Sequence, residues 1–574
     1  GRGARSADTI VYGLSLAVYC TSWTFFGAVG TAQTRGWEYL PIYLGPMIVF
    51  SIGRPVLWRL LEMGKARNTT SIADFISVHY GKSRRLAALV TLIAVVGALP
   101  YIALQLKSVS TTFDYLASPT APSSDAASAY GICFVALLLA VFSILFGTRH
   151  IDITKHNRGM ITAIAFDSII KLVALIAVGA FAVLMTTDPA AAPSPNGAAS
   201  VFNTPIAIDR FITLTLISMT AILCLPRQFH VTVVECQDRK WVGGGANVFL
   251  VYLAFISALV LPIADKGAVV LAASNVNPDL TVIALPLLNG SEALAAFVFV
   301  GGFAAATGMV IVASVALSTM IANDLVAPLL VGQSGARGAQ TRIGPRLLVA
   351  RRLSILFILM TAALFAIYAP TGEQLASFGI LSFAAASQFA PALIGALYWR
   401  GARLEGALAG LLAGFLVWAL ALFGPSYFGD NASPLFTNLG WLDFTGWDPL
   451  TRGVVVSLGV NTALLAFVSL LWAEHSENIV SRPSINNGAS PASPARAGDF
   501  YLLIQRCLGE REGAQIIDAF EAHRQLRREP DRVADADLIK FADQQISKAI
   551  GAPSASILLK SVLAGGAMQL HDVA

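Results

Sequence analysis

The stretch Tyr19-Cys20-Thr21-Ser22-Trp23-Thr24-Phe25-Phe26-Gly27-Ala28-Val29-Gly30 lies inside a long apolar segment that runs from about Thr9 to Gln33. It contains two glycines and four hydroxyl side chains. In hydrocarbon every backbone amide needs an internal partner, so such a helix must face protein or a water-filled cavity. Two interpretations stay open at this point. The stretch is either a close helix–helix contact made by small residues, or a helix broken near its middle.

The composition predicts a polytopic membrane protein. Of the 574 residues, 56% are hydrophobic and 13% are charged, whereas a soluble domain carries about 25% charged residues. The net charge of +5 indicates no nucleic-acid partner, because the basic residues cluster in particular loops. About twelve segments reach the length of roughly 20 apolar residues that crosses a bilayer. They lie near 9–34, 37–63, 86–116, 128–148, 157–187, 208–231, 241–264, 291–327, 349–370, 373–398, 403–424 and 450–473.

Basic residues alternate between the loops, and this bias sets the orientation. The basic loops hold Lys65, Arg67, Lys82, Arg84 and Arg85, then Arg149, Lys155 and Arg158, then Arg239 and Lys240, then Arg337, Arg342 and Arg346, and last Arg400 and Arg403. The loops 117–128, 188–200 and 425–448 contain no Lys or Arg. We therefore expect a multi-pass protein of the bacterial inner (plasma) membrane, with the first residues of this chain and its C-terminal part in the cytoplasm.

The composition changes after the last apolar segment. We expect a transmembrane domain over 1–475, a linker over 476–497 and a cytoplasmic helical domain over 498–574. In the last of these, Ala534–Ile550 has helical spacing and ends before Gly551, as in a small bundle of three or four helices. No HExxH, Walker or GxGxxG motif occurs in a fitting context, so neither a catalytic residue, a metal site nor an enzyme activity is predicted within this chain.

Polar side chains inside the predicted spans are candidates for function, because a charge at the bilayer centre costs about 2.5–3.5 kcal/mol on insertion scales. Asp167 and Lys171 lie four residues apart on one face of the fifth span. They form either a self-neutralising pair or an ion or proton relay, and we favour the relay. Gln105 in the third span is a weaker candidate.

The sixth span contains Leu225-Pro226-Arg227-Gln228-Phe229-His230, where the proline removes a backbone donor and favours a break. Arg227 and His230 are equally compatible with anchoring at the inner interface. In the tenth span, Gln388 precedes Pro391 and either binds a substrate or caps freed carbonyls. Interruptions in spans one and six, five helices apart and opposite in direction, predict an inverted repeat with a site between the broken helices. This pattern is typical of secondary transporters.

Several motifs resemble the solute/sodium symporter family. They are Arg35-Gly36-Trp37-Glu38, the stretch Thr69–Ser77, Phe166-Asp167, Ile321-Ala322-Asn323-Asp324 and Pro391–Trp399, in the family's order over most of residues 9–473. The resemblance implies the LeuT-like inverted repeat of about twelve helices, followed here by the small cytoplasmic bundle.

A closer resemblance is to CbrA-type proteins, in which such a module is fused to a STAC domain and then to PAS and histidine-kinase domains. It is carried by Tyr19–Gly27, Cys224–His230 and Ala305–Met309, by residues 498–564, which resemble STAC, and by the tail 566–574. It implies that this chain is the N-terminal part, that the family's usual first helix precedes Gly1, and that the partners are kinase domains in cis and a response regulator, besides the lipid bilayer and a small solute. The implied solute is an amino acid, with histidine as a guess. A plain ion- or proton-coupled symporter with a regulatory tail, and a transport-dead receptor, are the alternatives.

Two positions depart from the family's sodium ligands. Tyr19 stands where proline symporters have an Asp, and Gly308-Met309 stand where they have Ser-Thr; a shift in register would place Thr307 as one ligand. A hard cation needs oxygen ligands, so sodium coupling is doubtful, and a coupling proton, carried at Asp167, is expected without any further cofactor. The resulting substrate-binding candidates are Trp23, Thr24, Tyr101, Gln105, Gln228 and Gln388, and those for ion or proton coupling are Asp167, Lys171 and Thr307.

Overall fold

The computed structural model describes residues 2–118, 125–148, 158–185, 202, 205–236, 239–271, 276–330, 343–369, 375–428, 446–480, 495–524 and 529–563. Over these residues the chain is helical, with a single isolated β-bridge between Arg496 and Val533. Nine of the described helices are long and apolar enough to cross a membrane, and three bent helix pairs raise the number of spans to as many as twelve. The predicted all-α, multi-pass membrane fold is confirmed.

The helices follow one another along the chain in three groups. The first group, which covers spans one to five, contains α1 (Arg2–Leu16), η1 (Ala17–Tyr19), η2 (Trp23–Gly27), α2 (Ala28–Arg35), η3 (Gly36–Tyr39), α3 (Pro41–Ser51), α4 (Arg54–Ala66), α5 (Ile72–His79), α6 (Arg84–Ala117), α7 (Asp125–Gly147) and α8 (Arg158–Leu184).

The second group, which covers the sixth and later spans, contains α10 (Ile208–Cys224), α11 (Pro226–Phe229), η5 (His230–Val234), α12 (Arg239–Val270), η6 (Pro278–Leu280), α13 (Thr281–Leu288), α14 (Glu292–Met320), η7 (Ile321–Val326), α16 (Ile343–Tyr368), α17 (Leu375–Ser387), α18 (Ala390–Tyr398), α19 (Leu404–Trp418), η8 (Ala419–Phe423), α20 (Gly424–Phe428) and α22 (Pro449–Val480). The C-terminal group contains α23 (Ala497–Leu508), α24 (Glu510–His523), α25 (Ala536–Ile550) and α26 (Ala552–Leu563).

The first span is broken where the sequence predicts it. Its two halves, Ala7–Tyr19 and Trp23–Tyr39, meet at 75°. Cys20 between them is extended, with φ −77° and ψ 106°. The second half starts as a π-helical turn over Trp23–Gly27. The polar, glycine-containing stretch therefore breaks a helix inside the protein interior, and the alternative of a continuous small-residue contact is wrong.

The sixth span is broken in the same manner. Ile208–Cys224 and Pro226–Val234 meet at 51°. Leu225 at the break is extended, and Pro226, which has no N–H to donate, begins the next helix at a position where a donor is not needed. Interruptions in spans one and six agree with the predicted inverted repeat.

The second predicted span, over 37–63, corresponds to a bent pair of helices, a bend that the sequence analysis did not predict. The structure bends by 70° between α3 and α4. The cause is the sequence Gly53-Arg54-Pro55, in which the proline lacks a donor and cannot continue the hydrogen-bond ladder of α3. The Arg54 side chain compensates, because its Nε donates to the Phe50 carbonyl at 2.7 Å. A long apolar run concealed this bend at the sequence level.

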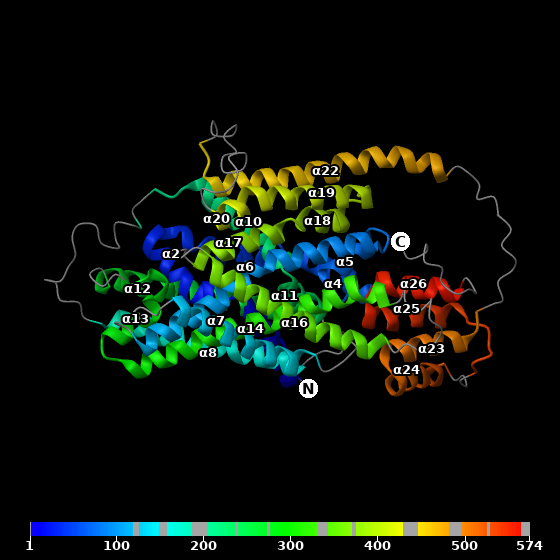
Figure 1. Ribbon diagram of the computed structural model, residues 1–574, viewed down its shortest axis with the longest axis horizontal. Coiled ribbons are helices and arrows are strands. Elements are labelled where there is room, and N and C mark those ends of the chain that lie inside the picture. Colours follow the sequence, from blue (N-terminus) through cyan, green and yellow to red (C-terminus); the bar gives the residue numbers. More distant parts are fainter. Residues whose placement is uncertain are drawn as a thin grey trace.

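The C-terminal helices α23–α26 form a small bundle at one end of the transmembrane helices, drawn in orange and red in Figure 1. A bundle of three or four helices was expected, and α25 ends at Gly551, whose φ of +81° no other residue type adopts easily. Its core continues into the transmembrane part through Ala322, Ile343 and Leu347. We call this side the bundle end and the opposite side, where α13 lies, the far end. Most of the predicted linker (481–494) and the tail 564–574 lie outside the described residues.

Candidate substrate and ion site at the helix breaks

Lys171 fills the break in the first span. Its side chain reaches from α8, is 3% exposed, and donates through Nζ to the main-chain carbonyls of Ala17 at 2.9 Å and Cys20 at 2.8 Å. The chain leaves regular helical geometry here, although the Ala17 carbonyl still accepts the Cys20 N–H at 3.0 Å, and a buried carbonyl without a partner is costly. An ammonium group therefore satisfies two oxygens that would otherwise be available to a bound cation.

The same break is supported from α6 by two predicted residues. Gln105 accepts a hydrogen bond from the Ser22 N–H through Oε1 at 3.1 Å. The hydroxyl groups of Tyr101 and Thr21 lie 2.9 Å apart. Both side chains are almost completely buried. Gln105 and Tyr101 hold the extended backbone in place. Gln105 thus makes a structural contact and also lies beside the candidate site.

The two broken spans touch each other. Gln228 in α11 donates through Nε2 to the Leu16 carbonyl of α1 at 3.4 Å. The Tyr12 hydroxyl donates to the Thr232 carbonyl at 3.1 Å, which joins the halves a second time. Elements more than 200 residues apart in sequence are thereby brought to one point, as expected for a site at the centre of an inverted repeat.

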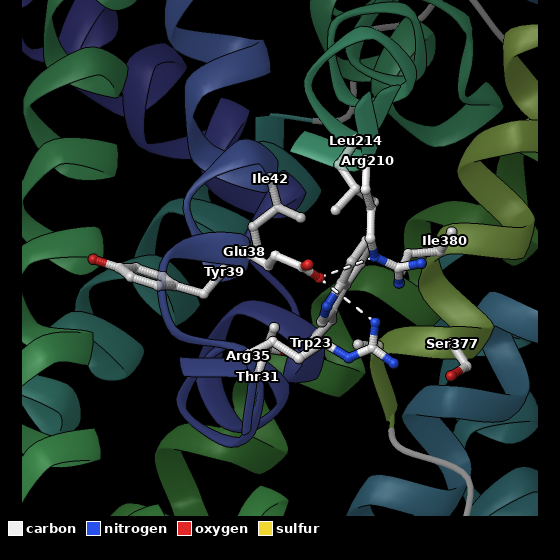
Figure 2. A pocket seen from close by; sticks show the side chains of 11 residues that line it. Trp23, Thr31, Arg35, Glu38, Tyr39, Ile42, Arg210, Leu214, Ser377 and Ile380 are labelled. Atoms are coloured by element: carbon white, nitrogen blue, oxygen red, sulfur yellow. Dashed lines mark hydrogen bonds and ion pairs between the residues drawn. The ribbon is translucent and has the colours of Figure 1, made fainter. Parts of the chain in front are cut away.

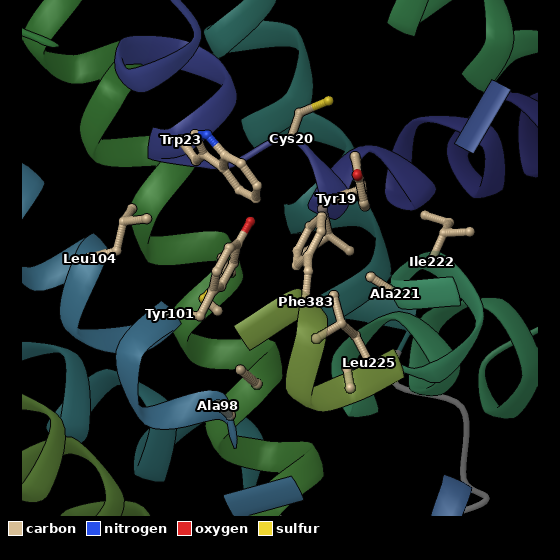
Figure 3. Close-up of a cluster of buried hydrophobic side chains, with 14 of the residues drawn as sticks. Tyr19, Cys20, Trp23, Ala98, Tyr101, Leu104, Ala221, Ile222, Leu225 and Phe383 are labelled. Atoms are coloured by element: carbon tan, nitrogen blue, oxygen red, sulfur yellow. The ribbon is translucent and has the colours of Figure 1, made fainter. Parts of the chain in front are cut away.

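Aromatic rings close the centre of this region (Figure 3). The ring centroid of Trp23 lies 4.9 Å from Phe383 and 6.2 Å from Tyr101, both edge-on. Tyr101 stacks on Phe383 at 5.6 Å, and Tyr19 lies 5.9 Å from the same phenylalanine. The predicted site between the broken helices is therefore packed with aromatic side chains in this conformation.

Arg227 lies at the break of the sixth span and is buried. Its exposed fraction is 2%, and its guanidinium carbon lies 4.2 Å from the centroid of the Tyr101 ring. Nε, Nη1 and Nη2 have no hydrogen-bond partner among the described residues. Burial on all sides excludes the interpretation of Arg227 as an interfacial anchor, which the sequence left open.

A small cavity opens on the far-end side of Trp23 (Figure 2). Its volume of about 30 Å³ has room for about two water molecules. The wall contains a charged group: Arg210 bonds to Glu38 at 2.9 Å and to Asp448 at 2.9 Å. Arg35 lies 3.6 Å from Glu38. The residues that line the cavity are Trp23, Thr31, Arg35, Glu38, Tyr39, Ile42, Arg210, Leu214, Ala376, Ser377 and Ile380.

Of the nine candidates from the sequence, five gather at the breaks: Trp23, Tyr101, Gln105, Lys171 and Gln228. Thr24 follows Trp23 and donates to the Thr21 carbonyl at 2.9 Å. Gln388 lies elsewhere, with Nε2 donating to Ser457 at 3.1 Å, while Asn461 donates to its Oε1 at 3.0 Å. Its hydrogen bonds thus lie between the kink of span ten and α22.

The remaining two candidates lie along the helices that flank the first break. The Thr307 hydroxyl donates to the carbonyls of Phe303 and Ala304 in its own helix. Asp167 lies against α14, since a Cβ added to Gly308 would meet its Oδ2 at 3.1 Å. The glycine at position 308 therefore leaves room for the carboxylate. The roles predicted for Asp167 and Thr307 stay predictions.

Sequence reasoning missed the group of Glu38, Arg210 and Asp448, which joins the ends of three spans. The charges at the predicted far-end boundaries were visible in the sequence, but their pairing depends on how the bent helices meet. It also left undecided whether Arg227 is buried or anchors the helix at the interface. In a broken helix, the distance of a residue from the predicted helix end does not give its depth in the protein. The usable indications of a break were Gly27 with the hydroxyl groups around it in the first span, and the prolines at 226 and 391.

The bundle end contains a second buried polar contact. The Ala552 N–H donates to Asp74 Oδ1 at 3.1 Å, and the Arg351 guanidinium donates to the Ala549 carbonyl at 3.3 Å. Lys82 and Asp543 form an ion pair at 3.2 Å at the rim. Burial raises the pKa of Asp74, an effect opposed by hydrogen bonds from Thr70 and Ala552. The turn between α25 and α26 is thus inserted between α5 and the ends of the transmembrane helices.

Comparison with known proteins agrees with this architecture. No protein-family model matches the chain. The uncharacterised symporter YodF of Bacillus subtilis (strain 168) is 22% identical over 427 residues, which cover 72% of this chain and 79% of the relative.

Among solved structures, the substrate-bound, outward-open state of a Na⁺-coupled sialic acid symporter matches with a TM-score of 0.57 and 12% identity, over 81% of this chain and 90% of that chain. A mutant manganese transporter from Eremococcus coleocola covers 94% of this chain and 95% of its own, but its TM-score is 0.38. The sialic acid symporter confirms the predicted transporter fold. The apolar helices and the bacterial relative agree with a multi-pass protein of the bacterial inner membrane. YodF and the sialic acid symporter are both transporters rather than enzymes.

Proposed function

We propose that this chain is a membrane transporter of the symporter type, which moves a small solute through a site between its two broken spans. The observation that carries the proposal is the junction of the breaks, where Gln228 of span six donates to the Leu16 carbonyl of span one. Half-helices that meet at the bilayer midplane offer main-chain groups to a solute, and transporters use them in this way. The similarity to YodF and the fold of the sialic acid symporter support it.

The coupling ion proposed is a proton rather than sodium. Lys171 already donates to the Ala17 and Cys20 carbonyls, so two oxygens of a potential cation site are occupied by the protein's own ammonium group. Met309 in α14 offers no hard oxygen ligand. Asp167, one helical turn before Lys171, is the group proposed to take up and release the proton.

The substrate class proposed is an amino acid, with histidine as the first solute to test. This part of the proposal rests on the resemblance of the motifs to CbrA-type proteins. The aromatic rings of Trp23, Tyr101 and Phe383 are compatible with it, since they would contact an apolar or aromatic side chain.

The cytoplasmic bundle is proposed to report the state of the transmembrane helices to signalling domains. Its contact through Asp74 and Ala552 lies between α5 and α26, where a movement of the bundle-end helices would reach it. The kinase in cis and the response regulator rest on the resemblance alone. A plain symporter whose bundle regulates transport uses the same contact and fits the comparisons equally well.

Uptake by the purified chain in proteoliposomes tests the transport proposal. With radiolabelled histidine and other labelled amino acids outside, an inward proton gradient is expected to drive accumulation, and an inward sodium gradient alone is not. Collapse of the proton gradient with an ionophore is the control. Accumulation driven only by sodium contradicts the coupling proposal. No uptake of any solute with either gradient contradicts transport and favours the receptor alternative.

A further inference from the structure

The buried cation at the sixth-span break has no counter-charge in the part of the chain that the structure describes. Arg227 is 2% exposed, and its three guanidinium nitrogens have no hydrogen-bond partner there. Burying a charge without a partner is strongly unfavourable, and an arginine stays charged at any physiological pH. The contact with the face of Tyr101 at 4.2 Å offsets part of this cost, since cation–π contacts are worth up to about 2 kcal/mol when desolvated.

The second buried cation nearby, Lys171, has acceptors of its own. Lys171 uses its ammonium group on the carbonyls of Ala17 and Cys20, and the acid closest along its helix, Asp167, lies against Gly308 of α14. Glu235 lies 3.4 Å from His230 and belongs to the η5 end of the broken span. Arg227 is therefore a buried cation whose guanidinium nitrogens have no acceptor among the described residues, and an incoming anion would supply one.

The groups around Arg227 indicate which chemical class of anion fits there. Its guanidinium lies on Tyr101, whose ring also contacts Trp23 and Phe383. Trp23 in turn lines the cavity of about 30 Å³ on the far-end side. Tyr101 and Trp23 therefore lie one after the other between the guanidinium and that cavity, and both rings would have to move to connect them. The five donors of a guanidinium match a planar carboxylate in a two-point contact.

We propose that Arg227 binds the carboxylate group of the transported solute, and that the rings of Trp23, Tyr101 and Phe383 enclose the rest of it. This inference rests on the proposed transport function, and it specifies the solute as a carboxylate-bearing molecule rather than an amine, a sugar or a metal ion. In the present conformation the guanidinium rests on Tyr101, and the solute carboxylate replaces the missing hydrogen-bond acceptors when it enters.

Ligand-induced thermal stabilisation of the full chain in detergent tests this assignment. The probes are an equimolar mixture of the neutral L-amino acids with histidine, the matched mixture of their carboxamides, and inorganic phosphate. A ligand that binds the folded state raises its melting temperature in proportion to its concentration relative to Kd. The amino acids are expected to stabilise the wild type at concentrations at least tenfold lower than the carboxamides, and phosphate is expected to have no comparable effect.

The variant Arg227→Met is expected to abolish the preference for amino acids over carboxamides. Arg59→Met is the matched control, because Arg59 makes a similar contact with the Tyr398 ring at 4.7 Å but is exposed and lies outside the site. It should keep the wild-type preference. If Arg227→Met does not fold, Arg227→Lys decides, because lysine keeps the charge but loses the planar fork. An increase of threefold or more in its midpoint concentration for amino acids supports the assignment.

Four results overturn it: equal stabilisation of the wild type by carboxamides, equal stabilisation by phosphate, no stabilisation by the amino acids, or an unchanged preference in the Arg227 variants. Uptake measured in parallel separates this inference from the transport proposal. If the wild type accumulates solute and Arg227→Met keeps the same carboxylate preference, only the role of Arg227 is wrong. If no solute is accumulated, transport fails while the binding result still stands.

Discussion

The Lys171 ammonium nitrogen lies 2.8 Å from the main-chain carbonyl oxygen of Cys20, at the point where the first span is extended. The same nitrogen is 2.9 Å from the Ala17 carbonyl. A side-chain cation from α8 therefore holds the broken helix in the position where a diffusible cation would be expected. This relationship connects the polar stretch in the first span with the charge in the fifth.

Replacing Lys171 with methionine is expected to reduce the initial rate of uptake in proteoliposomes at least tenfold. The change removes the ammonium donor from two buried carbonyls, of which that of Ala17 keeps the Cys20 N–H at 3.0 Å, and an orphaned buried acceptor costs about 1–3 kcal/mol. Lys107→Met is the control, since its ammonium lies 5.3 Å from the Phe378 ring and not at the break. Its rate should stay within twofold of wild type. Equal losses in the two variants would show that Lys171 has no special role at the break.

The sequence predicted those features that depend on local chemistry. Gly27 and the hydroxyl groups around it indicated the first break, and Pro226 indicated the sixth. The bend at Gly53-Arg54-Pro55 escaped because the apolar run continues through it. The partners of Lys171 could not be predicted, because the Ala17 and Cys20 carbonyls face α8 only through the way the broken first span folds against that helix.

The burial of individual side chains was the second feature that the sequence did not predict. Arg227 and Arg59 both lie in apolar segments, yet the first is 2% exposed and the second lies on the surface over Tyr398. Helical spacing alone does not separate these cases when the helix is broken. Gln388 was correctly placed at a kink, but its partners Ser457 and Asn461 belong to a helix about 70 residues later.

Replacing Arg210 with alanine is expected to open the far end of the site. Arg210 joins Glu38 and Asp448 with its side chain only 15% exposed, so its loss leaves two partly buried carboxylates without their shared partner. The labelling rate of a cysteine introduced by Ser377→Cys, which lies in the cavity wall, should rise at least threefold with a membrane-impermeant maleimide.

The matched control for this opening is Arg35→Ala in the same Ser377→Cys background. Arg35 lies 3.6 Å from Glu38 but its side chain is 47% exposed, and exposed ion pairs contribute at most about 1 kcal/mol. Its labelling rate should change less than twofold. A rate that does not rise in the Arg210 variant would refute the closing role of this charged group.

Gly30→Ala is expected to destabilise the protein. A Cβ at this position would overlap Asp279 Oδ1 and lie 2.9 Å from the Asp279 backbone nitrogen. Asp279 would have to move, although its Oδ2 accepts the Leu375 N–H at 2.8 Å and so holds the start of α17. Overpacking of this kind costs typically about 1–3 kcal/mol, which should appear as a lower melting temperature in detergent.

Gly459→Ala in α22 serves as the comparison, with the opposite expected sign. No atom lies within 4 Å of a Cβ added there. Alanine favours the helix over glycine by about 1 kcal/mol, so the melting temperature should rise or stay constant. A melting temperature for Gly30→Ala equal to that of Gly459→Ala would contradict the close packing of α2 on η6.

The contact between the C-terminal bundle (α23–α26) and α5, which we call the docked state, is expected to strengthen as the pH falls. Burial raises the pKa of Asp74 in the docked state, so the carboxyl holds its proton more tightly there than when the bundle is released. The docked state is therefore favoured at low pH and loses this contribution as the pH rises through the raised pKa. Hydrogen exchange of the amides around Ala552, corrected for the intrinsic pH dependence of exchange, measures the effect.

Variants of Asp74 isolate this effect. Asp74→Asn keeps an oxygen that can accept the Ala552 N–H but cannot ionise, so protection should become independent of pH. Asp74→Ala removes the acceptor, and protection should fall at every pH. Asp543→Asn is the control, because the rim ion pair with Lys82 is partly exposed and contributes little. Protection in wild type that does not depend on pH would contradict the proposed linkage.

Direct binding of radiolabelled sodium to the purified chain tests the central claim, that Lys171 replaces a sodium ion at the first break. We predict no saturable sodium binding to the wild type in a scintillation proximity assay, at concentrations at which a sodium-coupled symporter is saturated. Saturable binding by the wild type that Thr307→Ala abolishes would contradict the account, because it would show that a sodium ion is held at this site together with Lys171.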